Sequence, residues 1–285
     1  MFLIIGYVIV LLASIGTYAI HGDVRLLWVP AEYAAIVGLT IGGFVAGNNM
    51  TVIKHTLAAI GPALKPSKYN KAFYIETLAL IFEVLSKAKK EGLMAIEADV
   101  EEPEKSALFK KYPTVSDDHH VIDFITDYLR MMIGGNLNPN EIENLMDVEL
   151  DIMMHEEMEP SHIVAKTGDA TPAFGIVVAV MGVVNVMSSV GQPPAVLGKM
   201  IGGALVGTFL GILISYGFIA PIASLLEQKA KASEPIFKSV KMALLASMSG
   251  YAPAVAVEFG RKAIAMHDRP SFKELEAELK ARKGK

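Results

Sequence analysis

Two short runs of acidic residues and histidines are the part of this sequence that could hold a metal ion or perform acid–base chemistry. The first is DDHH at 117–120, and the second is HEEME at 155–159. Neither has the HExxH spacing, which places two histidines on one face of a helix to bind zinc. Both runs lie in highly charged stretches, where a solvated helix surface is the usual explanation. We therefore expect no metal site and no enzyme.

Other kinds of chemistry have no matching sequence pattern either. The chain has no cysteine, which removes disulfide, thiol and cysteine–zinc chemistry. It has no glycine-rich phosphate loop of the Walker type, so we expect no nucleotide hydrolysis and no cofactor. Its basic residues are not interleaved with aromatic residues on any one element, so nucleic-acid binding is not indicated.

A different set of polar side chains lies inside long apolar runs. The stretch ALVGTFLGILISYGFIAP (204–221) holds Thr208 near its middle and Pro221 at its end. A threonine hydroxyl in such a run can bond back to its own helix. Alternatively, the hydroxyl of Thr208 lines a polar path with Asn185, Ser188, Ser189 or Tyr216.

Long apolar helices must position these residues. The chain of 285 residues is 52% hydrophobic and has a mean hydropathy of +0.41. The runs without Asp, Glu, Lys or Arg are 1–22, 33–53, 170–198 and 200–226. A helix needs ~20 residues to cross ~30 Å of hydrocarbon. We predict transmembrane helices at 2–20, 31–49, 172–191 and 200–224. The first run lacks the basic start and cleavage site of a secretory signal.

The basic residues predict the topology. Of 26 Lys and Arg residues, 12 lie in 54–166 and 12 in 229–285, whereas the two short loops hold only Arg25 and Lys199. Basic segments near membrane ends face the cytoplasm. We therefore expect both termini in the cytoplasm.

The predicted fold class is all-α, a polytopic membrane protein with four transmembrane helices and a helical cytoplasmic domain. The predicted parts are a membrane hairpin (1–53), a helical insert (54–169), a channel hairpin (170–226) and a helical tail (227–285). Helical spacing of apolar residues is clear at 73–90, 120–133 and 138–154, with Gly134 and Gly135 as a break. Ser271 and Glu274 form a possible capping box in the tail.

The fourth run has small residues at every fourth position, which let another helix approach closely: Gly203, Gly207, Gly211 and Ser215. Pro172 lies near the start of the predicted third helix, where a proline is tolerated in the first turn. Glu32 and Asp169 stand only at the edges of the runs. A membrane machine driven by ions usually has an intramembrane carboxylate. Hence either the chain moves no ions, or a partner helix brings the carboxylate.

Stretches across nearly the whole chain resemble the flagellar stator proteins of the MotA/TolQ/ExbB proton-channel family. The run 204–221 and the preceding GDATPAFGIVVAVMGVV (168–184) resemble the third and fourth membrane helices of its MotA members. Further matches are PAEYAAIVG (30–38), SKYNKAFY (67–74), FITDYLR (124–130), GYAPAVAVEFGRK (250–262) and RPSF (269–272).

The resemblance implies a multi-pass protein of the bacterial inner membrane, with five copies around a dimer of the single-span partner MotB. That partner supplies the ion-binding aspartate and the peptidoglycan anchor. The transported ion is expected to be H⁺, with Na⁺ as the alternative, and the rotor protein FliG receives the torque.

The resemblance also implies roles for individual residues. Pro172 and Pro221 match the paired prolines that couple ion binding to cytoplasmic movement, and Thr208 matches the threonine that faces the ion path. In 86–103, Glu97 matches the acidic rotor contact, and Lys89 takes the place of the family's arginine. Lys90 is the alternative for that place, and Glu149 is a further rotor-contact candidate. A lysine keeps the charge but loses the planar fork of arginine.

Two other functions stay open from the sequence. An ExbB- or TolQ-type energizer of outer-membrane processes works by a similar mechanism, but it has three spans and lacks an N-terminal hairpin like 1–53. A helical membrane scaffold that conducts nothing belongs to a different class. Proton uptake by vesicles would separate the scaffold from a channel.

Overall fold

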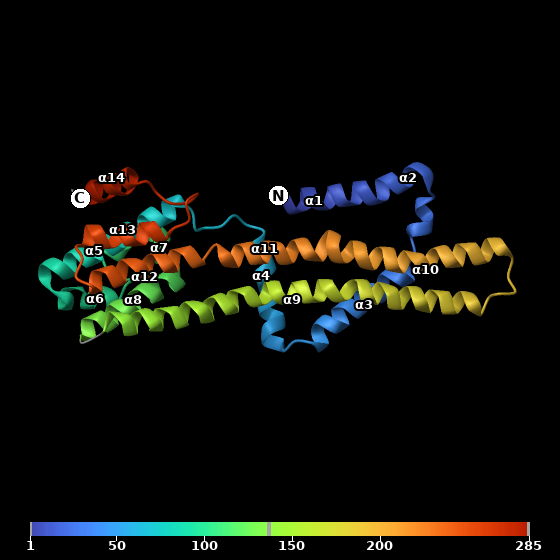
Figure 1. Ribbon diagram of the computed structural model, residues 1–285, viewed down its shortest axis with the longest axis horizontal. Helices are drawn as coiled ribbons and strands as arrows, with labels where there is room; N and C mark the ends of the chain where they lie inside the picture. The colour runs from blue at the N-terminus through green and yellow to red at the C-terminus, as the bar shows by residue number, and fades with distance from the viewer. Residues whose placement is uncertain (1, 136–137, 284–285) are drawn as a thin grey trace. The chain divides into compact units, whose positions relative to one another are not determined.

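The computed structural model describes residues 2–135 and 138–283, and every regular element among them is helical (Figure 1). This confirms the predicted all-α fold class. The chain divides into two compact units. The apolar unit comprises Met1–Pro66 and Glu156–Lys229, and the charged unit comprises Ser67–His155 and Ala230–Lys285.

The apolar unit takes most of its helices from the four charge-free runs. They are α1 (Phe2–Leu11), α2 (Thr17–His21), α3 (Pro30–Ala46), α4 (Met50–Ala63), the later part of α9 (Pro139–Met187), α10 (Pro194–Ile214) and α11 (Ala220–Lys231). A π-helical turn at Leu12–Gly16 joins α1 to α2, and another at Ser215–Ile219 joins α10 to α11. The predicted second membrane helix reaches residue 49, but α3 ends at Ala46 because Asn49 caps α4 by accepting from the Val52 N–H.

Among the described residues, four helical stretches are long and apolar enough to cross a membrane, judged by length and composition. They are Phe2–His21, Val24–Ala46, Pro139–Met187 and Pro194–Met248. The number of membrane crossings and their predicted bounds stay predictions.

Helix α9 is longer than the sequence suggested. It runs unbroken for 49 residues, so that Pro160 and Pro172 both lie in its interior. The expectation that Pro172 occupies the first turn of a helix is therefore wrong. An interior proline removes one intrahelical hydrogen bond and costs about 3 kcal/mol or more unless the surroundings compensate.

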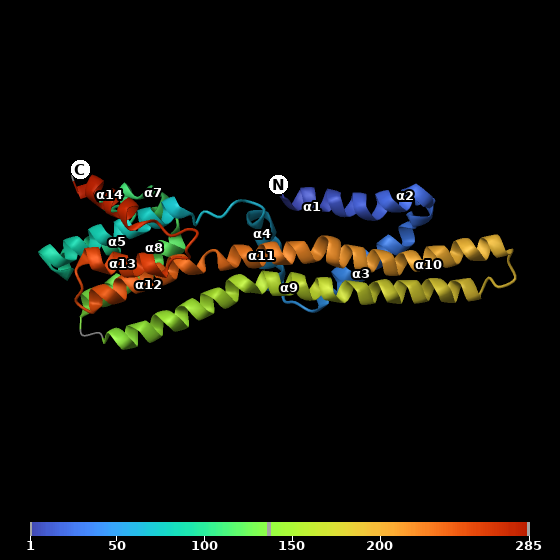
Figure 2. The ribbon, with the colours of Figure 1, turned by 45° about the horizontal axis from the view of Figure 1, so that its top comes forward.

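Glycines set the close approach of α9 and α10, which lie side by side in both ribbon views (Figure 1 and Figure 2). A Cβ atom at Gly175 would lie 2.7 Å from the Gly207 carbonyl oxygen and 2.9 Å from the Gly211 Cα. Alanine there would push the helices apart. The predicted small-residue face is thus confirmed at Gly207 and Gly211. It is wrong at Gly203, where a Cβ would meet only Val29, at 4.0 Å.

The charged unit is built around one hydrophobic core. Its helices are α5 (Lys71–Glu91), α6 (Glu97–Glu101), α7 (Pro113–Ser116), α8 (His119–Gly134), the early part of α9, α12 (Glu234–Met248), α13 (Pro253–Ala263) and α14 (Phe272–Lys283). Five aromatic side chains are fully buried in this core: Phe73, Tyr74, Phe109, Tyr112 and Phe237. Burial of one such side chain contributes about 1.5–3 kcal/mol.

Local signals in the charged unit act as the sequence predicts. The predicted helices at 73–90 and 120–133 correspond to α5 and α8, and Gly135 ends α8 with φ +78°, a conformation that favours glycine. The capping box is confirmed, since Glu274 accepts from the Ser271 N–H at 2.7 Å and Ser271 accepts from the Glu274 N–H at 3.2 Å.

Candidate functional site

The two predicted coupling prolines lie in turns that pack against each other. Pro172 has no N–H, so the carbonyl of Gly168 one turn earlier lacks the usual donor four residues later in the helix. The buried hydroxyl of Ser215 donates to that carbonyl across the helix pair, at 2.7 Å. Ser215 begins the π-helical turn that leads into Pro221, and Ile219 of the same turn would be 3.0 Å from a Cβ at Gly168. The turns before the two prolines are thus directly connected.

A second buried hydroxyl connects α9 with the continuous segment of α10, the π-helical turn and α11, and this bond runs in the opposite direction. Ser161 of α9 donates to the carbonyl of Ala223 in α11, at 2.9 Å. Each helix therefore donates one side-chain hydrogen bond to the backbone of the other. Such bonds fix the register of two helices more strictly than apolar packing does, because a buried carbonyl left without a donor costs about 1–3 kcal/mol.

Thr208 lies on α10 directly after the close-packed Gly207 and is half-buried. Thr167 and Thr171 on α9 bond back to their own helix, at 2.8 Å in both cases. The Thr208 hydroxyl, by contrast, has no hydrogen-bond partner within the described part of the chain. Of the two fates that the sequence left open, the back-bonded one is not found, and the hydroxyl is free to meet a ligand or partner.

The other two predicted path residues do not join Thr208 in one cluster. Tyr216 is 62% exposed and follows Thr208 by roughly 12 Å along the helix axis, at ~1.5 Å per residue. Asn185 is exposed near the end of α9, where its carbonyl accepts from the Ser188 hydroxyl at 2.7 Å. Their role in an ion path stays a prediction.

In the apolar unit, the carboxylate of Glu32 reaches into the packing of the helices, although the charge-free runs themselves hold no acid. Glu32 stands in the first turn of α3, and its Oε2 atom is buried without a hydrogen bond from any described residue. A Cβ at Gly207 would lie 3.3 Å from this oxygen, so the carboxylate meets α10 beside Thr208. Glu32 stands at the edge of its helix, as expected, but the expectation did not include the contact of its carboxylate with α10. The residues around Glu32 carry no signal of this contact, because Gly207 lies in a helix far along the chain.

In the charged unit, the predicted rotor-contact residues flank one turn. Lys89 and Lys90 lie in the last turn of α5 and Glu97 in the first turn of α6, so each charge suits its end of the helix dipole. All three side chains are exposed, and none forms an ion pair within the described residues. Gly92, with φ +92°, makes the turn between them. These charges are therefore available to another protein.

Lys89 and Lys90 face different surroundings. Lys89 borders a cavity of about 420 Å³ with Leu93 and Tyr251, whereas Lys90 borders another of about 460 Å³ with Asp99. The preceding Lys87 is paired with Asp99 at 2.7 Å. Burial alone would raise the pKa of Asp99, but hydrogen bonds from Lys87 and Ser106 lower that pKa below its usual value.

Glu149, the further rotor-contact candidate, already has a partner in the structure. Its carboxylate accepts a hydrogen bond from the Tyr128 hydroxyl of α8. Burial and the Glu149 carboxylate raise the pKa of Tyr128 above its usual value. Glu149 is exposed and connects α8 to the early part of α9, so a structural contribution is evident, and its contact with a rotor stays a prediction.

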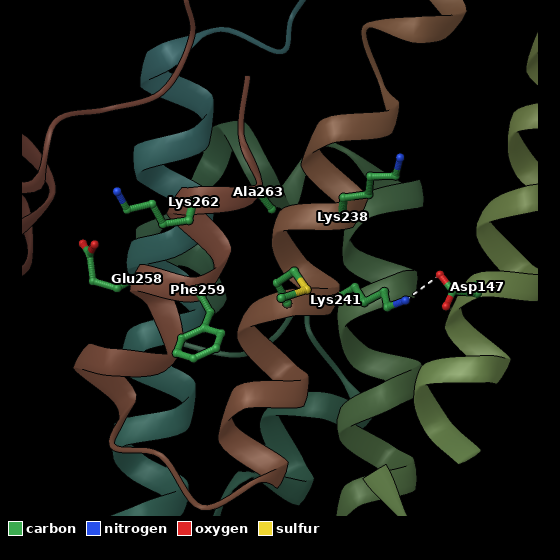
Figure 3. A pocket seen from close by; sticks show the side chains of 8 residues that line it. Asp147, Lys238, Lys241, Glu258, Phe259, Lys262 and Ala263 are labelled. Atoms are coloured by element: carbon green, nitrogen blue, oxygen red, sulfur yellow. Dashed lines mark hydrogen bonds and ion pairs between the residues drawn. The ribbon is translucent and has the colours of Figure 1, made fainter. Parts of the chain in front are cut away.

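A cavity of about 670 Å³ in the charged unit lies between α12 and α13 (Figure 3). Phe259 and Ala263 line it together with charged side chains. Among these, the side chain of Lys241 is 8% exposed, and its ammonium group points to Asp147, with which it pairs (Figure 3). The cavity thus combines apolar walls with a rim of charges that are largely paired.

The acidic–histidine runs do not converge. Asp118 in DDHH is 3% exposed and pairs with Lys68 at 2.7 Å. Within residues 2–135 and 138–283, no group of three or more His, Asp or Glu side chains could hold a metal ion.

Comparison with known proteins covers most of the chain. A family model described as motility protein A N-terminal matches residues 4–92, and the MotA/TolQ/ExbB proton channel family matches residues 117–239. Motility protein A of Salmonella typhimurium is 44% identical over 282 residues, which are 99% of this chain and 96% of the relative. Motility protein A of Escherichia coli is 45% identical over the same shares of the two chains. The chemotaxis protein LafT of Vibrio parahaemolyticus is 32% identical over 98% of this chain and 99% of the relative.

Two solved structures have a similar fold. The flagellar MotAB stator complex of Bacillus subtilis matches with a TM-score of 0.71 and 25% identity, over 96% of this chain and 98% of the other. MotAB of C. jejuni matches with a TM-score of 0.74 and 19% identity, over 95% of this chain and 98% of the other.

Proposed function

This chain belongs to the motility protein A family and is a flagellar stator subunit, and we propose that it forms a proton channel with MotB and converts the proton-motive force into torque on FliG. The proposed assembly is a pentamer of this chain around a MotB dimer. The match of the N-terminal family model to residues 4–92 favours this function over an ExbB- or TolQ-type energizer, since such energizers lack an N-terminal hairpin like 1–53.

The proposed location is the inner membrane, with several crossings and both termini in the cytoplasm. The distribution of basic residues supports this topology, because 24 of 26 lie in 54–166 and 229–285 (12 in each segment). In this topology the exposed Lys89, Lys90 and Glu97 face the cytoplasm, where a rotor protein can contact them. Electrostatic attraction at exposed charges sets orientation and encounter rate more than affinity.

The observation that carries the proposal is the connection of the two proline turns beside the close-packed α9–α10 pair. MotB would bring the main ion-binding carboxylate to the surface that presents Thr208. One elementary charge crossing 100 mV releases ~2.3 kcal/mol, and ~1.4 kcal/mol changes a two-state population about tenfold. A change of contacts at Thr208 would reach the Ser215–Gly168 bond and the turn before Pro221, and from there α11. These residues form the proposed coupling element.

Motility tests the proposal directly. In a strain that depends on this chain, we expect swimming speed to fall with a protonophore and to be independent of sodium concentration. Replacement of Pro172 by a bulky residue should abolish swimming while the complex with MotB still assembles in the membrane. Normal swimming of that variant would refute the coupling role, and speed that follows sodium but ignores the protonophore would refute the proton.

A further inference from the structure

The feature that the proposed function leaves unused is the carboxylate of Glu32. The two helices that it meets are drawn from the runs 170–198 and 200–226, and neither run contains a lysine or arginine that could pair with Glu32. Its Oε2 atom is buried and accepts no hydrogen bond from the described residues, and Glu32 takes part in no ion pair there. It is therefore a half-buried acid with one oxygen enclosed at an apolar helix junction, without a structural partner among the described residues.

Ordinary structural roles do not account for this side chain. An acidic residue in the first turn of a helix commonly caps backbone N–H groups. The first turn of α3 instead has no side-chain cap, and Pro30 removes one of the N–H groups that would need one. The neighbouring Tyr33 does have a structural contact, since its hydroxyl donates to the Leu27 carbonyl at 3.3 Å. Glu32 has no corresponding bond.

The packing leaves room for the carboxylate at the seam of α9 and α10. A Cβ at Gly207 would lie 3.3 Å from Oε2, which is tighter than ordinary van der Waals contact, and one at Gly182 would lie 3.7 Å from Oε1. Both glycines thus let the carboxylate reach backbone atoms of two helices. Thr208, with its free hydroxyl, is the next residue after Gly207.

A charged carboxylate without a partner is unfavourable in a membrane, because neither water nor an opposite charge stabilises it there. Binding a cation removes that cost, and a proton is the cation that one buried oxygen can hold alone. We propose that Glu32 is a proton-carrying group of the ion path. An O–H bond forms at its carboxylate when a proton arrives and breaks when the proton passes on toward the carboxylate of the partner. The proposal rests on the proposed function and adds to it a protonatable site supplied by this chain.

Proton uptake by vesicles that contain the complex of this chain with MotB tests the proposal. The key variant is Glu32→Gln, which keeps the shape and polarity of the side chain but cannot release a proton. We expect its uptake to fall by at least about tenfold, in the range of removing an acid–base group. Glu32→Asp keeps the chemistry and should retain most of the uptake. Tyr33→Phe is the matched control in the same turn and should conduct like the wild type.

The outcomes separate the two proposals. Assembly of each variant with MotB is checked by co-purification, so that a folding defect is recognised. If the wild-type complex conducts and an assembled Glu32→Gln complex conducts within about twofold of it, the role of Glu32 is refuted while the channel stands. Equal losses in Glu32→Gln and Tyr33→Phe would also refute it, because local packing would then be the cause. A wild-type complex without proton uptake would refute the proposed function itself.

Discussion

Replacement of Ser215 by alanine is expected to destabilise the apolar unit in a way that depends on Pro172. Ser215→Ala removes the side-chain donor to the Gly168 carbonyl at a buried position, and Pro172 has no N–H to replace it. A buried carbonyl left unsatisfied costs about 1–3 kcal/mol. In a Pro172→Ala background, the new N–H at residue 172 can bond this carbonyl within α9. The cost of Ser215→Ala should then fall below about 1 kcal/mol, because the carbonyl keeps a donor.

A double-mutant cycle measures this coupling. The free energy of unfolding of the purified complex is obtained by denaturant titration for the wild type, both single variants and the double variant. Ser161→Ala supplies the matched control, since it breaks the other cross-helix bond. The acceptor of that bond is the Ala223 carbonyl, which does not depend on the N–H that Pro172 lacks. Its effect should add to that of Pro172→Ala within about 0.5 kcal/mol. Equal costs of Ser215→Ala in both backgrounds would refute the explanation of how α9 tolerates its interior proline.

Three further predictions concern packing, rotor contact and pH. Gly211→Val should abolish assembly with MotB, measured by co-purification, because even a Cβ would lie 2.8 Å from the Gly175 Cα, whereas Gly202→Ala meets nothing within 4 Å and should assemble normally. Glu97→Lys should lower swimming speed without changing proton uptake, and Glu97→Gln should have a smaller effect; equal effects would contradict a charge contact. The Lys71 ammonium and Ser271 hold the pKa of Glu274 at about 2, below its usual 4.5, so these bonds persist above pH 4.5 and are lost as the pH falls toward 2. The protection of the α14 amides, measured as the exchange rate relative to that of an unfolded peptide at the same pH, should fall across this window, and constant protection would contradict the assignment.

The sequence predicted the features that depend on local chemistry. Charge-free runs revealed the apolar helices, and the spacing of Gly207 and Gly211 predicted the close helix contact because small residues at every fourth position lie on one face. The capping box at Ser271 and Glu274 and the glycine break at Gly135 were predicted because each is a signal within the local sequence. Each of these signals is complete within a few residues.

The features that the sequence did not reveal depend on contacts between distant segments. Pro172 was expected near the start of a helix, because a proline is tolerated there. The hydroxyl of Ser215, which donates to the Gly168 carbonyl inside the long helix, lies 47 positions further along the chain and gives no local signal. The engagement of Glu149 by Tyr128 and the burial of the Glu32 carboxylate against α10 are likewise tertiary contacts. A side chain at the edge of an apolar run can lie inside the packing when a neighbouring helix covers it.

Proton uptake by vesicles, compared for this chain alone and for its complex with MotB, tests the account most directly. We predict strong uptake by the complex and little by the chain alone, because Glu32 is the only acid in Val24–Ala46 and the proposed path needs the carboxylate of MotB as well. Uptake by the isolated chain equal to that of the complex would contradict the account.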